Sequence, residues 1–392
     1  MSARGAPLAG LRVLDLSRVL AGPFAGRMLA DLGADVVKVE PPEGDVTRGW
    51  GQVRHGLGGY YVQQNVGKRA MCVDLGAPGG SDLLVRLAQR ADVLIENFRP
   101  HVMAQYGLGW ERLSALNPRL VMLSISGFGA ASPEAHRPAY APVLHAESGA
   151  VARQAELDRA PRTTDFVLSN ADTNAGLHGL VAILAALHAR ERSGAGQHVD
   201  LAMLDAMLAT DDYAHFALDQ AEISRGGGEV WDAPGGPIMV TGDFRNLWRV
   251  LTKKLGVADP TPESATLEQK IEARRAAAGR FYASAFATRA ELTAALDRVA
   301  IPWGDVRSVA EAFESPTARA RGSAVRIDDR AGGERLVVQS PYRFSNAASG
   351  VAGAARYRGE DNRAVLADWL GAPDDEISRL EAAGVLLAEK RP

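Results

Sequence analysis

The chain has 392 residues, of which 46% are hydrophobic and 23% charged, the proportions of a globular protein long enough for two domains. Its formal net charge is −3 and its Lys and Arg residues are spread along the chain, which argues against a nucleic-acid-binding protein with a concentrated basic face. Cys72 is the single cysteine, so no intramolecular disulfide can form, and no apolar run of signal-peptide or membrane-spanning length occurs; a cytoplasmic protein is expected.

The first forty residues predict a strand, a helix and a second strand. Residues 11–16 (LRVLDL) form a short apolar strand, followed by a loop that contains Gly22 and Pro23. Residues 25–32 have the apolar spacing of a helix, and residues 35–40 (DVVKVE) read as the next strand. A strand–helix–strand unit of this kind predicts a parallel sheet.

The same alternation continues to about residue 130. Strands are expected at residues 70–74, 93–97 and 120–125, with a helix at residues 80–91. The apolar runs are continuous rather than alternating, which is typical of strands covered on both faces. The fold class expected is therefore α/β, with a large, open, Rossmann-like sheet.

The rest of the chain predicts a further part of the sheet and then a change of composition. A helix is expected at residues 174–192, and a strand at residues 198–203 leads into another helix. Glycines at 226–228 and in the 232–236 stretch predict an interdomain link. Two helices rich in Arg, Glu and Ala and a strand at 302–306 are expected between residues 237 and 325, then short strands and a final helix near residues 376–383.

The first loop invites comparison with a dinucleotide-binding site, because Glu40 could bind a ribose. The loop reads Leu-Ala-Gly-Pro-Phe-Ala-Gly, so its glycines are Gly22 and Gly26 and the G-x-G-x-x-G pattern is absent. A nicotinamide enzyme is therefore disfavoured. Residues 19–26 still remain a candidate nucleotide contact, since N–H groups at the start of a helix favour phosphate.

Several segments along the chain, taken together and in order, resemble the class III CoA-transferases. They are the opening PLAGLRVLDLSRVLAGPFAGRMLADLGADVVKVEPPEGD, then NVGKRAMCVDL, ADVLIENFRP, LNPRLVMLSISGFG, RPAYAPVLHAESG, ADTNAGLHGLVAILAALHARERSGAGQHVDLAMLDAML, IPWGDVRSVAEAFESPTARARG and SPYRFS. The resemblance implies a CoA-binding domain built from both chain ends, here 1–224 and 326–392, and a smaller α+β domain, here 225–325. It also implies an interlocked homodimer that exchanges CoA between an acyl-CoA and a carboxylic acid, with no metal or redox cofactor.

The resemblance assigns the nucleophile to Asp172. This residue is expected just before the helix that starts near Asn174, where helix N–H groups would stabilise its ionised form. The local sequence alone favours a different role, because Asp is among the preferred N-cap residues. The match along the whole chain favours the nucleophile.

The residue type at position 140 distinguishes two kinds of related enzyme. Tyr140 matches a tyrosine that lines the acyl-CoA site of the transferases, whereas the related α-methylacyl-CoA racemases have a proton-transferring histidine there. His145, five residues later, is expected to be a core or surface histidine. Transfer is therefore preferred to racemisation or epimerisation, and a catalytically silent CoA-binding protein is the alternative from another class.

Other CoA-site residues follow from the same resemblance. Val19 and Ala21 are expected to contact CoA through their backbone, and Asn97 and Phe98 through a matching Asn-Phe pair, although Phe98 could equally belong to the core.

The chain also departs from the relatives that use oxalate. Leu20 replaces a glutamine, Pro41 a basic residue and Gln105 an arginine, for which Arg99 could substitute. These departures put formate and oxalate in doubt as substrates. Arg137 is a candidate partner for a dicarboxylate, and the glycines at 226–228 and 235–236 are candidates for a mobile loop. No metal-ligand spacing and no Gly-x-Ser-x-Gly pattern occur.

Overall fold

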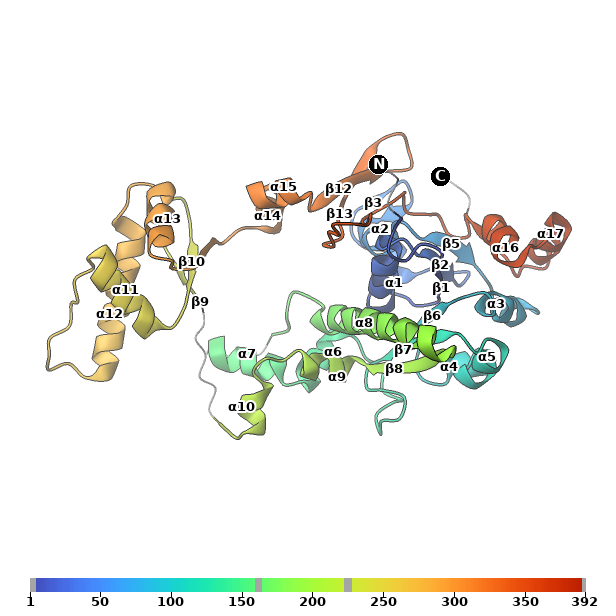
Figure 1. Cartoon of the computed structure of the whole chain (residues 1–392), viewed down its shortest axis with the longest axis horizontal. Coiled ribbons are helices and arrows are strands. Elements are labelled where there is room, and N and C mark those ends of the chain that lie inside the picture. Colours follow the sequence, from blue (N-terminus) through green and yellow to red (C-terminus); the bar gives the residue numbers. More distant parts are fainter. Residues whose placement is uncertain (1–4, 159–163, 222–227, 390–392) are drawn as a thin grey trace. The chain divides into compact units, whose positions relative to one another are not determined.

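The structure, a computed structural model, describes residues 5–158, 164–221 and 228–389 (Figure 1). The chain divides into two compact units. Unit 1 combines Met1–Asp212 with Ala320–Pro392, so both ends of the chain contribute to it, and unit 2 is Tyr213–Arg319.

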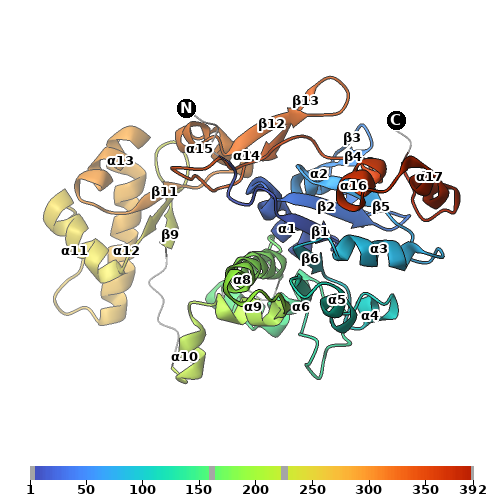
Figure 2. The same ribbon diagram turned by 45° about the vertical axis from the view of Figure 1, so that its right-hand side comes forward.

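Unit 1 is built on a six-stranded parallel sheet, which confirms the α/β class (Figures 1 and 2). Its strands, in spatial order, are β5 (Arg69–Cys72), β2 (Asp35–Glu40), β1 (Arg12–Asp15), β6 (Val93–Glu96), β7 (Val121–Ser126) and β8 (Gln197–Ala202). The chain runs outward from β1 to β2 and β5 on one side, then returns and runs through β6, β7 and β8 on the other. The direction of winding therefore reverses between β1 and β6, where open parallel sheets of this type bind their ligands.

Both faces of this sheet are covered by helices. Val13 and Leu14, neighbours on β1, are fully buried in two different hydrophobic clusters, one on each face. The first face packs against α1 (Ala21–Asp31), α6 (Ala141–Glu147), α8 (Asn170–Ser193) and α9 (Met203–Ala209). The second packs against α3 (Gly80–Ala88), α4 (Val102–Gln105), α5 (Trp110–Leu116), α16 (Asn362–Leu370) and α17 (Asp374–Ala382). The continuous apolar runs of the sequence follow from this double coverage.

The remaining elements of unit 1 are short. They are η1 (Val46–Gly49), β3 (Val53–Arg54), β4 (Leu57–Gly58), α2 (Gly59–Asn65), α7 (Ala150–Asp158), β12 (Ala324–Asp328) and β13 (Glu334–Val338). Tyr61 and Val62 of α2 pack with Ile327 and Val337 of the β12–β13 hairpin in a separate hydrophobic cluster. This cluster joins the N-terminal half of the unit to its C-terminal segment.

Unit 2 has its own core and more helices than the two expected from its composition. It contains α10 (Ala214–Leu218), β9 (Gly228–Trp231), β10 (Ile238–Thr241), α11 (Phe244–Leu255), α12 (Leu267–Ser284), α13 (Arg289–Arg298), β11 (Trp303–Asp305) and α14 (Val309–Glu314), and α15 (Pro316–Arg321) crosses its boundary. Capping boxes at Thr266, Thr288 and Ser308 start three of these helices separately. The corresponding signals T-x-x-Q, T-x-x-E and S-x-x-E are present in the sequence and mark the start of each of these helices.

Two helices start earlier than the sequence predicts, and both differences matter for function. α1 begins at Ala21, so Gly22 and Pro23 lie in its first turn rather than in a loop. Proline is tolerated there because the first N–H groups of a helix have no partner within the helix. α8 begins at Asn170 with Ser169 as its N-cap, so Asp172 lies inside the first turn and is not the cap.

Candidate active site

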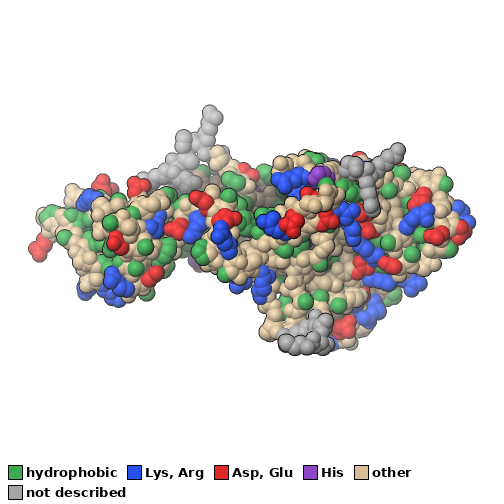
Figure 3. All heavy atoms as spheres, turned by 90° about the horizontal axis from the view of Figure 1, so that it is seen from above, with side chains coloured by type: hydrophobic (Ala, Val, Ile, Leu, Met, Phe, Trp, Pro, Cys, Tyr) green, Lys and Arg blue, Asp and Glu red, His purple; other side chains and the backbone are tan. Residues whose placement is uncertain are grey.

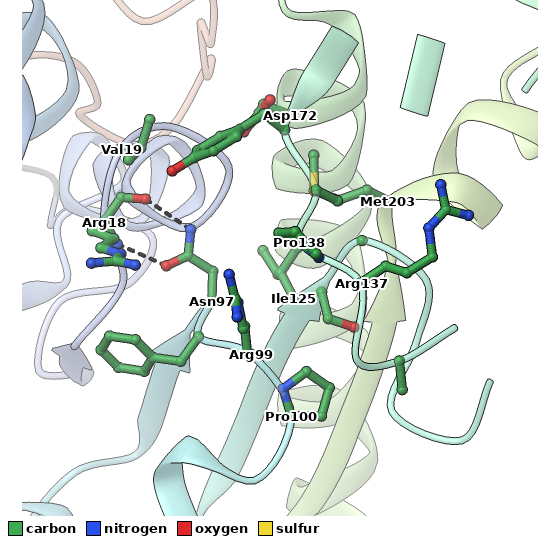
Figure 4. A pocket seen from close by; sticks show the side chains of 16 residues that line it. Arg18, Val19, Asn97, Arg99, Pro100, Ile125, Arg137, Pro138, Asp172 and Met203 are labelled. Carbon is green, nitrogen blue, oxygen red and sulfur yellow. Dashed lines mark hydrogen bonds between the residues drawn. The ribbon is translucent and has the colours of Figure 1, made fainter. Parts of the chain in front are cut away.

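A pocket of about 140 Å³ lies where the winding of the sheet reverses (Figure 4). Arg18 and Val19, which follow β1, line it together with residues 97–100, which follow β6, and residues 125–127 at the end of β7. Asp172 and Tyr140 also face this pocket. The structure thus brings the expected nucleophile and four of the five expected CoA contacts, Val19, Asn97, Phe98 and Tyr140, to one site.

Asp172 lies half-buried in the first turn of α8, among the starts of three helices. The backbone N–H groups of Ala21 and Ala141, the first residues of α1 and α6, lie near enough to its carboxylate to lower its pKa, as does its own N–H group. Ala21, the fifth expected contact, does not line the pocket, and its backbone N–H group lies beside the carboxylate instead. The first N–H groups of these helices point outward because no helical carbonyl lies before them.

Two opposed effects determine the protonation of Asp172. Burial raises its pKa to about 6, against the lowering effect of the Ala21 and Ala141 N–H groups. The carboxylate is therefore ionised at neutral pH and more basic than an ordinary aspartate. A basic, partly desolvated carboxylate is a suitable nucleophile.

The approach of α1 to α8 depends on a glycine. A Cβ atom on Gly176 would lie 2.8 Å from the carbonyl oxygen of Ala21 and 2.9 Å from Cδ1 of Phe24. Real Cβ contacts are not so short, so only glycine permits this spacing. Gly176 therefore brings the first N–H group of α1 within reach of Asp172.

The loop between β1 and α1 is strained at Val19. This β-branched residue has a φ of 69°, in the left-handed region that favours glycine. Its N–H group donates to Oδ2 of Asp45 at 3.2 Å, and Lys38 Nζ donates to the same oxygen at 3.0 Å. Strain of this kind persists only where the surrounding contacts hold it, and it is frequent at functional sites.

A buried polar network beneath the loop supplies those contacts. Asp15 pairs with Lys68 at 2.8 Å and accepts the N–H group of Ser17 at 3.1 Å, while Lys38 donates to the carbonyl of Ser17. Burial raises the pKa of Asp15, but the Lys68 and Lys38 ammonium groups outweigh it and the pKa is lowered. No sequence motif predicts this network, although Asp15 and Lys38 stand out as charged residues in largely apolar strands.

Asn97 joins the two loops that meet at the pocket. Its side-chain oxygen accepts the N–H group of Arg18 and its side-chain nitrogen donates to the Arg18 carbonyl, both at 2.8 Å (Figure 4). Phe98 packs partly against the core, and the guanidinium of Arg18 lies 6.0 Å from the centre of its ring. The amide of Asn97 is therefore occupied in fixing the loop, while Phe98 borders both the core and the pocket.

The three arginines around the pocket differ in their partners. Arg137 pairs with Glu147 at 2.6 Å and also with Glu134, so its charge is already balanced. In the part of the chain that the structure describes, neither Arg18 nor Arg99 forms an ion pair, and both are exposed. Arg18 and Arg99 are therefore better placed than Arg137 to bind an anionic group of a ligand.

Two tyrosines lie near Asp172. Tyr140 is 62% exposed and is the N-cap of α6, so its ring is not part of the hydrophobic core. Tyr60 on α2, which no motif of the sequence marks, is also close to Asp172. Burial raises its pKa to about 12, with smaller contributions from the charges of Asp172 and Asp45, so its hydroxyl stays protonated.

The glycines proposed for a mobile loop belong to unit 2, whereas the residues that line the pocket belong to unit 1. Gly226 and Gly227 lie outside the described residues, and Gly228 begins β9 in unit 2. Gly235 and Gly236 form the turn between β9 and β10, both with positive φ. The turn of this hairpin therefore explains why both positions are glycines.

Three further observations concern membrane-spanning helices, metal-binding groups and surface charge. Within residues 5–158, 164–221 and 228–389, no helix is long and apolar enough to cross a bilayer. The same residues contain no group of three or more His, Cys, Asp or Glu side chains arranged to hold a metal ion. On the face displayed in Figure 3, acidic and basic side chains are interspersed rather than gathered by sign.

Comparison with known proteins gives a consistent result over nearly the whole chain. Residues 8–362 match the profile of CoA-transferase family III. The succinate–glutarate CoA-transferase of Agrobacterium fabrum is 37% identical, with 88% of this chain and 92% of the relative covered. The succinyl-CoA–D-citramalate CoA-transferase of Chloroflexus aurantiacus is 33% identical, with 97% and 98% covered. The crystal structure of a CAIB/BAIF family protein from Brucella suis superposes with a TM-score of 0.79 at 30% identity, covering 93% of this chain and all of that one.

Proposed function

Because this chain belongs to CoA-transferase family III and is an enzyme of that class, we propose that it transfers CoA through a covalent intermediate on Asp172. The donor is an acyl-CoA and the acceptor a carboxylic acid. The observation that carries this proposal is the ionised, partly desolvated Asp172 carboxylate in the pocket at the reversal point of the sheet.

The reaction proceeds by two exchanges at the aspartyl carboxyl group. The Asp172 carboxylate attacks the thioester carbonyl, the C–S bond breaks, and a mixed anhydride and the CoA thiolate result. The thiolate then attacks the aspartyl carbonyl and releases the donor acid, leaving an aspartyl-CoA thioester. The acceptor carboxylate attacks this thioester, and the two steps run in reverse to give the new acyl-CoA and free Asp172. Covalent catalysis in this form keeps the energy of the thioester.

In this scheme the backbone N–H groups near Asp172 stabilise the negative charge that develops during the reaction. When the thiolate attacks the aspartyl carbonyl, negative charge develops on its oxygen. The Ala21 and Ala141 N–H groups already face the carboxylate oxygens, so they can stabilise that charge without reorganisation. The Asn97 bridge and the Asp45 contact to Val19 hold the segment that leads to Ala21.

We propose further that unit 1 binds CoA and that the protein acts as an interlocked homodimer, as the family resemblance implies. Val19 and Ala21 would contact CoA through their backbone, and Phe98 and Tyr140 through their rings. Light scattering should give the mass of a dimer, which persists on dilution if the two chains are threaded through each other.

The acids exchanged are proposed to be dicarboxylic. Both relatives reported above are named for succinate or succinyl-CoA together with another acid. The distal carboxylate of succinyl-CoA requires a cation, and Arg99 and Arg18 are the pocket arginines with no carboxylate partner among the described residues. This proposal is tested by comparing succinyl-CoA with butyryl-CoA, which is of similar length and lacks the distal charge. We expect succinyl-CoA to be preferred, and Arg99→Gln to raise its KM more than Arg137→Gln; equal use of both donors would contradict the proposal.

Trapping of the intermediate tests the transfer mechanism. The protein is incubated with succinyl-CoA, treated with hydroxylamine or borohydride, and digested for mass spectrometry. We expect a modification at Asp172 that is absent in Asp172→Asn. Exchange of the substrate's α-proton without a covalent modification would indicate racemisation instead, and CoA binding with neither reaction would indicate a silent binding protein.

A further inference from the structure

His145 is a buried residue beneath the candidate nucleophile, and the proposed reaction does not use it. It lies on α6 and is 0% exposed. Its ring packs against Phe166, 5.1 Å between centres, in the segment that leads into α8. The sequence predicts a core or surface histidine here, and the structure places it in the core.

Both ring nitrogens of His145 have partners. Nδ1 lies 2.7 Å from Oδ1 of Asp165, and Nε2 accepts the backbone N–H group of Ala171 at 3.1 Å. Because an N–H group points at Nε2, that nitrogen carries the lone pair, and the proton of the neutral ring is on Nδ1. Asp165 accepts this proton and so selects the tautomer.

The contact with Ala171 replaces a missing helix cap. The N-cap of α8, Ser169, makes no side-chain hydrogen bond to the helix. Ala171 is the second residue of α8, whose N–H group an N-cap side chain normally accepts. The next residue is Asp172. Nε2 of His145 therefore fixes the turn of backbone from which the Asp172 carboxylate projects.

We propose that His145, in the tautomer that Asp165 imposes, is a positioning residue that caps α8 from outside and orients Asp172 for attack. This inference rests on the proposed function, since it assumes that Asp172 is the nucleophile. It does not make His145 a proton donor or acceptor for the substrate, because neither ring nitrogen is free and the ring does not line the pocket.

Two substitutions of His145 separate its contacts. The side-chain oxygen of Gln reaches about as far as Nε2 and can still accept the Ala171 N–H group, whereas Asn reaches only as far as Nδ1 and can bind Asp165 alone. We expect His145→Asn to lower the rate of acyl-aspartate formation about 100-fold, the cost of misplacing a reacting group by about 1 Å. His145→Gln should retain most of that rate, and KM for the acyl-CoA should change little in either variant.

Two further variants are needed: Asp165→Asn tests the tautomer of His145, and Ser148→Ala is the control. The side-chain amide that Asp165→Asn introduces could donate to Nδ1 and so permit the wrong tautomer, as happens in other buried His–carboxylate pairs. The rate of acyl-aspartate formation in Asp165→Asn should therefore fall. Because Asp165 is exposed, this substitution leaves the hydrophobic core intact. Ser148 donates to the backbone carbonyl of His145 at 3.2 Å and touches neither ring nitrogen. Ser148→Ala should therefore have the wild-type rate.

Nitrogen-15 spectra of the histidine side chains supply a readout that is independent of activity. The wild-type signal assigned to His145, identified by its loss in His145→Gln, should be that of the Nδ1–H tautomer, and Asp165→Asn should shift it towards Nε2–H. An Nε2–H signal in the wild type, or equal rates for His145→Gln and His145→Asn, would overturn the inference. Absence of an Asp172 modification in the wild type would instead overturn the proposed function, so the two failures are distinguishable.

Discussion

At the scale of single residues, Asp172 is held between burial, which opposes its charge, and backbone N–H groups, which favour it. The balance leaves a carboxylate with a pKa of about 6, compared with an ordinary value of 3.8. Two predictions follow from that difference, one for the rate of reaction and one for stability.

The rate of acylation should depend on pH through Asp172. Only the ionised carboxylate attacks the thioester, so kcat/KM should be constant above about pH 7 and fall about tenfold per pH unit below about pH 6. The measurement is initial-rate kinetics between about pH 5 and pH 8 with the fraction of folded protein followed in parallel. A profile that stays flat down to about pH 5 would contradict the assignment of the raised pKa to the reacting group.

Removing the charge of Asp172 should stabilise the protein at neutral pH. Since the pKa is raised in the folded state, the folded protein binds this proton more tightly than the unfolded chain, and the favourable effect is present at low pH and lost as pH rises through about 6. Asp172→Asn should therefore increase the free energy of unfolding at pH 8 by roughly 1–2 kcal/mol, allowing for solvent screening at a half-buried site.

Urea denaturation at two pH values measures this effect. The difference between Asp172→Asn and the wild type should be present at about pH 8 and nearly absent at about pH 4. A destabilised variant at pH 8 would mean that the N–H contacts favour the charged carboxylate more than burial opposes it.

At the scale of elements, the site depends on how closely α1 approaches α8. Gly176 faces the backbone of Ala21, whereas Gly179, one turn later, faces the side-chain methyl groups of Leu123 on β7. An added Cβ would lie 2.8 Å from an atom in both cases, but a side-chain methyl group can move more readily than a helix backbone.

This difference makes a matched pair of substitutions. Gly176→Ala should displace the start of α1 from Asp172 and lower the acylation rate, with a loss of stability of about 1–3 kcal/mol from overpacking. Gly179→Ala should cost less stability and leave the rate nearly unchanged. Acylation kinetics and urea unfolding of both variants test this; an undiminished rate in a destabilised Gly176→Ala would show that the Ala21 N–H group is not needed.

At the scale of the whole molecule, the chain forms two units that are each organised around their own hydrophobic core. The cluster in unit 2 includes Trp248, Leu251, Tyr282 and Leu292 and shares no residue with the clusters of unit 1. The chain passes between the units only at residues 212–213 and 319–320. Separate cores favour separate cooperative unfolding.

Calorimetry should therefore resolve two unfolding transitions. If CoA binds to unit 1, as proposed, saturating CoA should raise the Tm of one transition by mass action and leave the other nearly unchanged. At a CoA concentration 100 times Kd the stabilisation is about 2.7 kcal/mol. A single transition that shifts as a whole with CoA would contradict independent unfolding of the two units.

The amino-acid sequence by itself determined the parallel α/β sheet and the enzyme class. Continuous apolar runs such as residues 93–95 and 120–123 are local signals, because a strand that is buried on both faces is apolar along most of its own length. The family motifs are likewise contiguous segments, and the profile match over residues 8–362 confirmed the class they implied. Helix starts were less well determined, since the first N–H groups of α1 and α8 face residues far away in the sequence, Asp172 and His145 respectively.

Only the tertiary structure brought the site together. Contacts such as Ala21 and Ala141 with Asp172, Asp15 with Lys68, and His145 with Ala171 join residues that are 26 to 151 positions apart. No local pattern specifies such contacts, because they arise when the packing of separate helices on one sheet places polar groups within hydrogen-bond distance. The sequence identified Asp172 as a candidate, and the packing of α1, α6 and α8 decided which groups surround it.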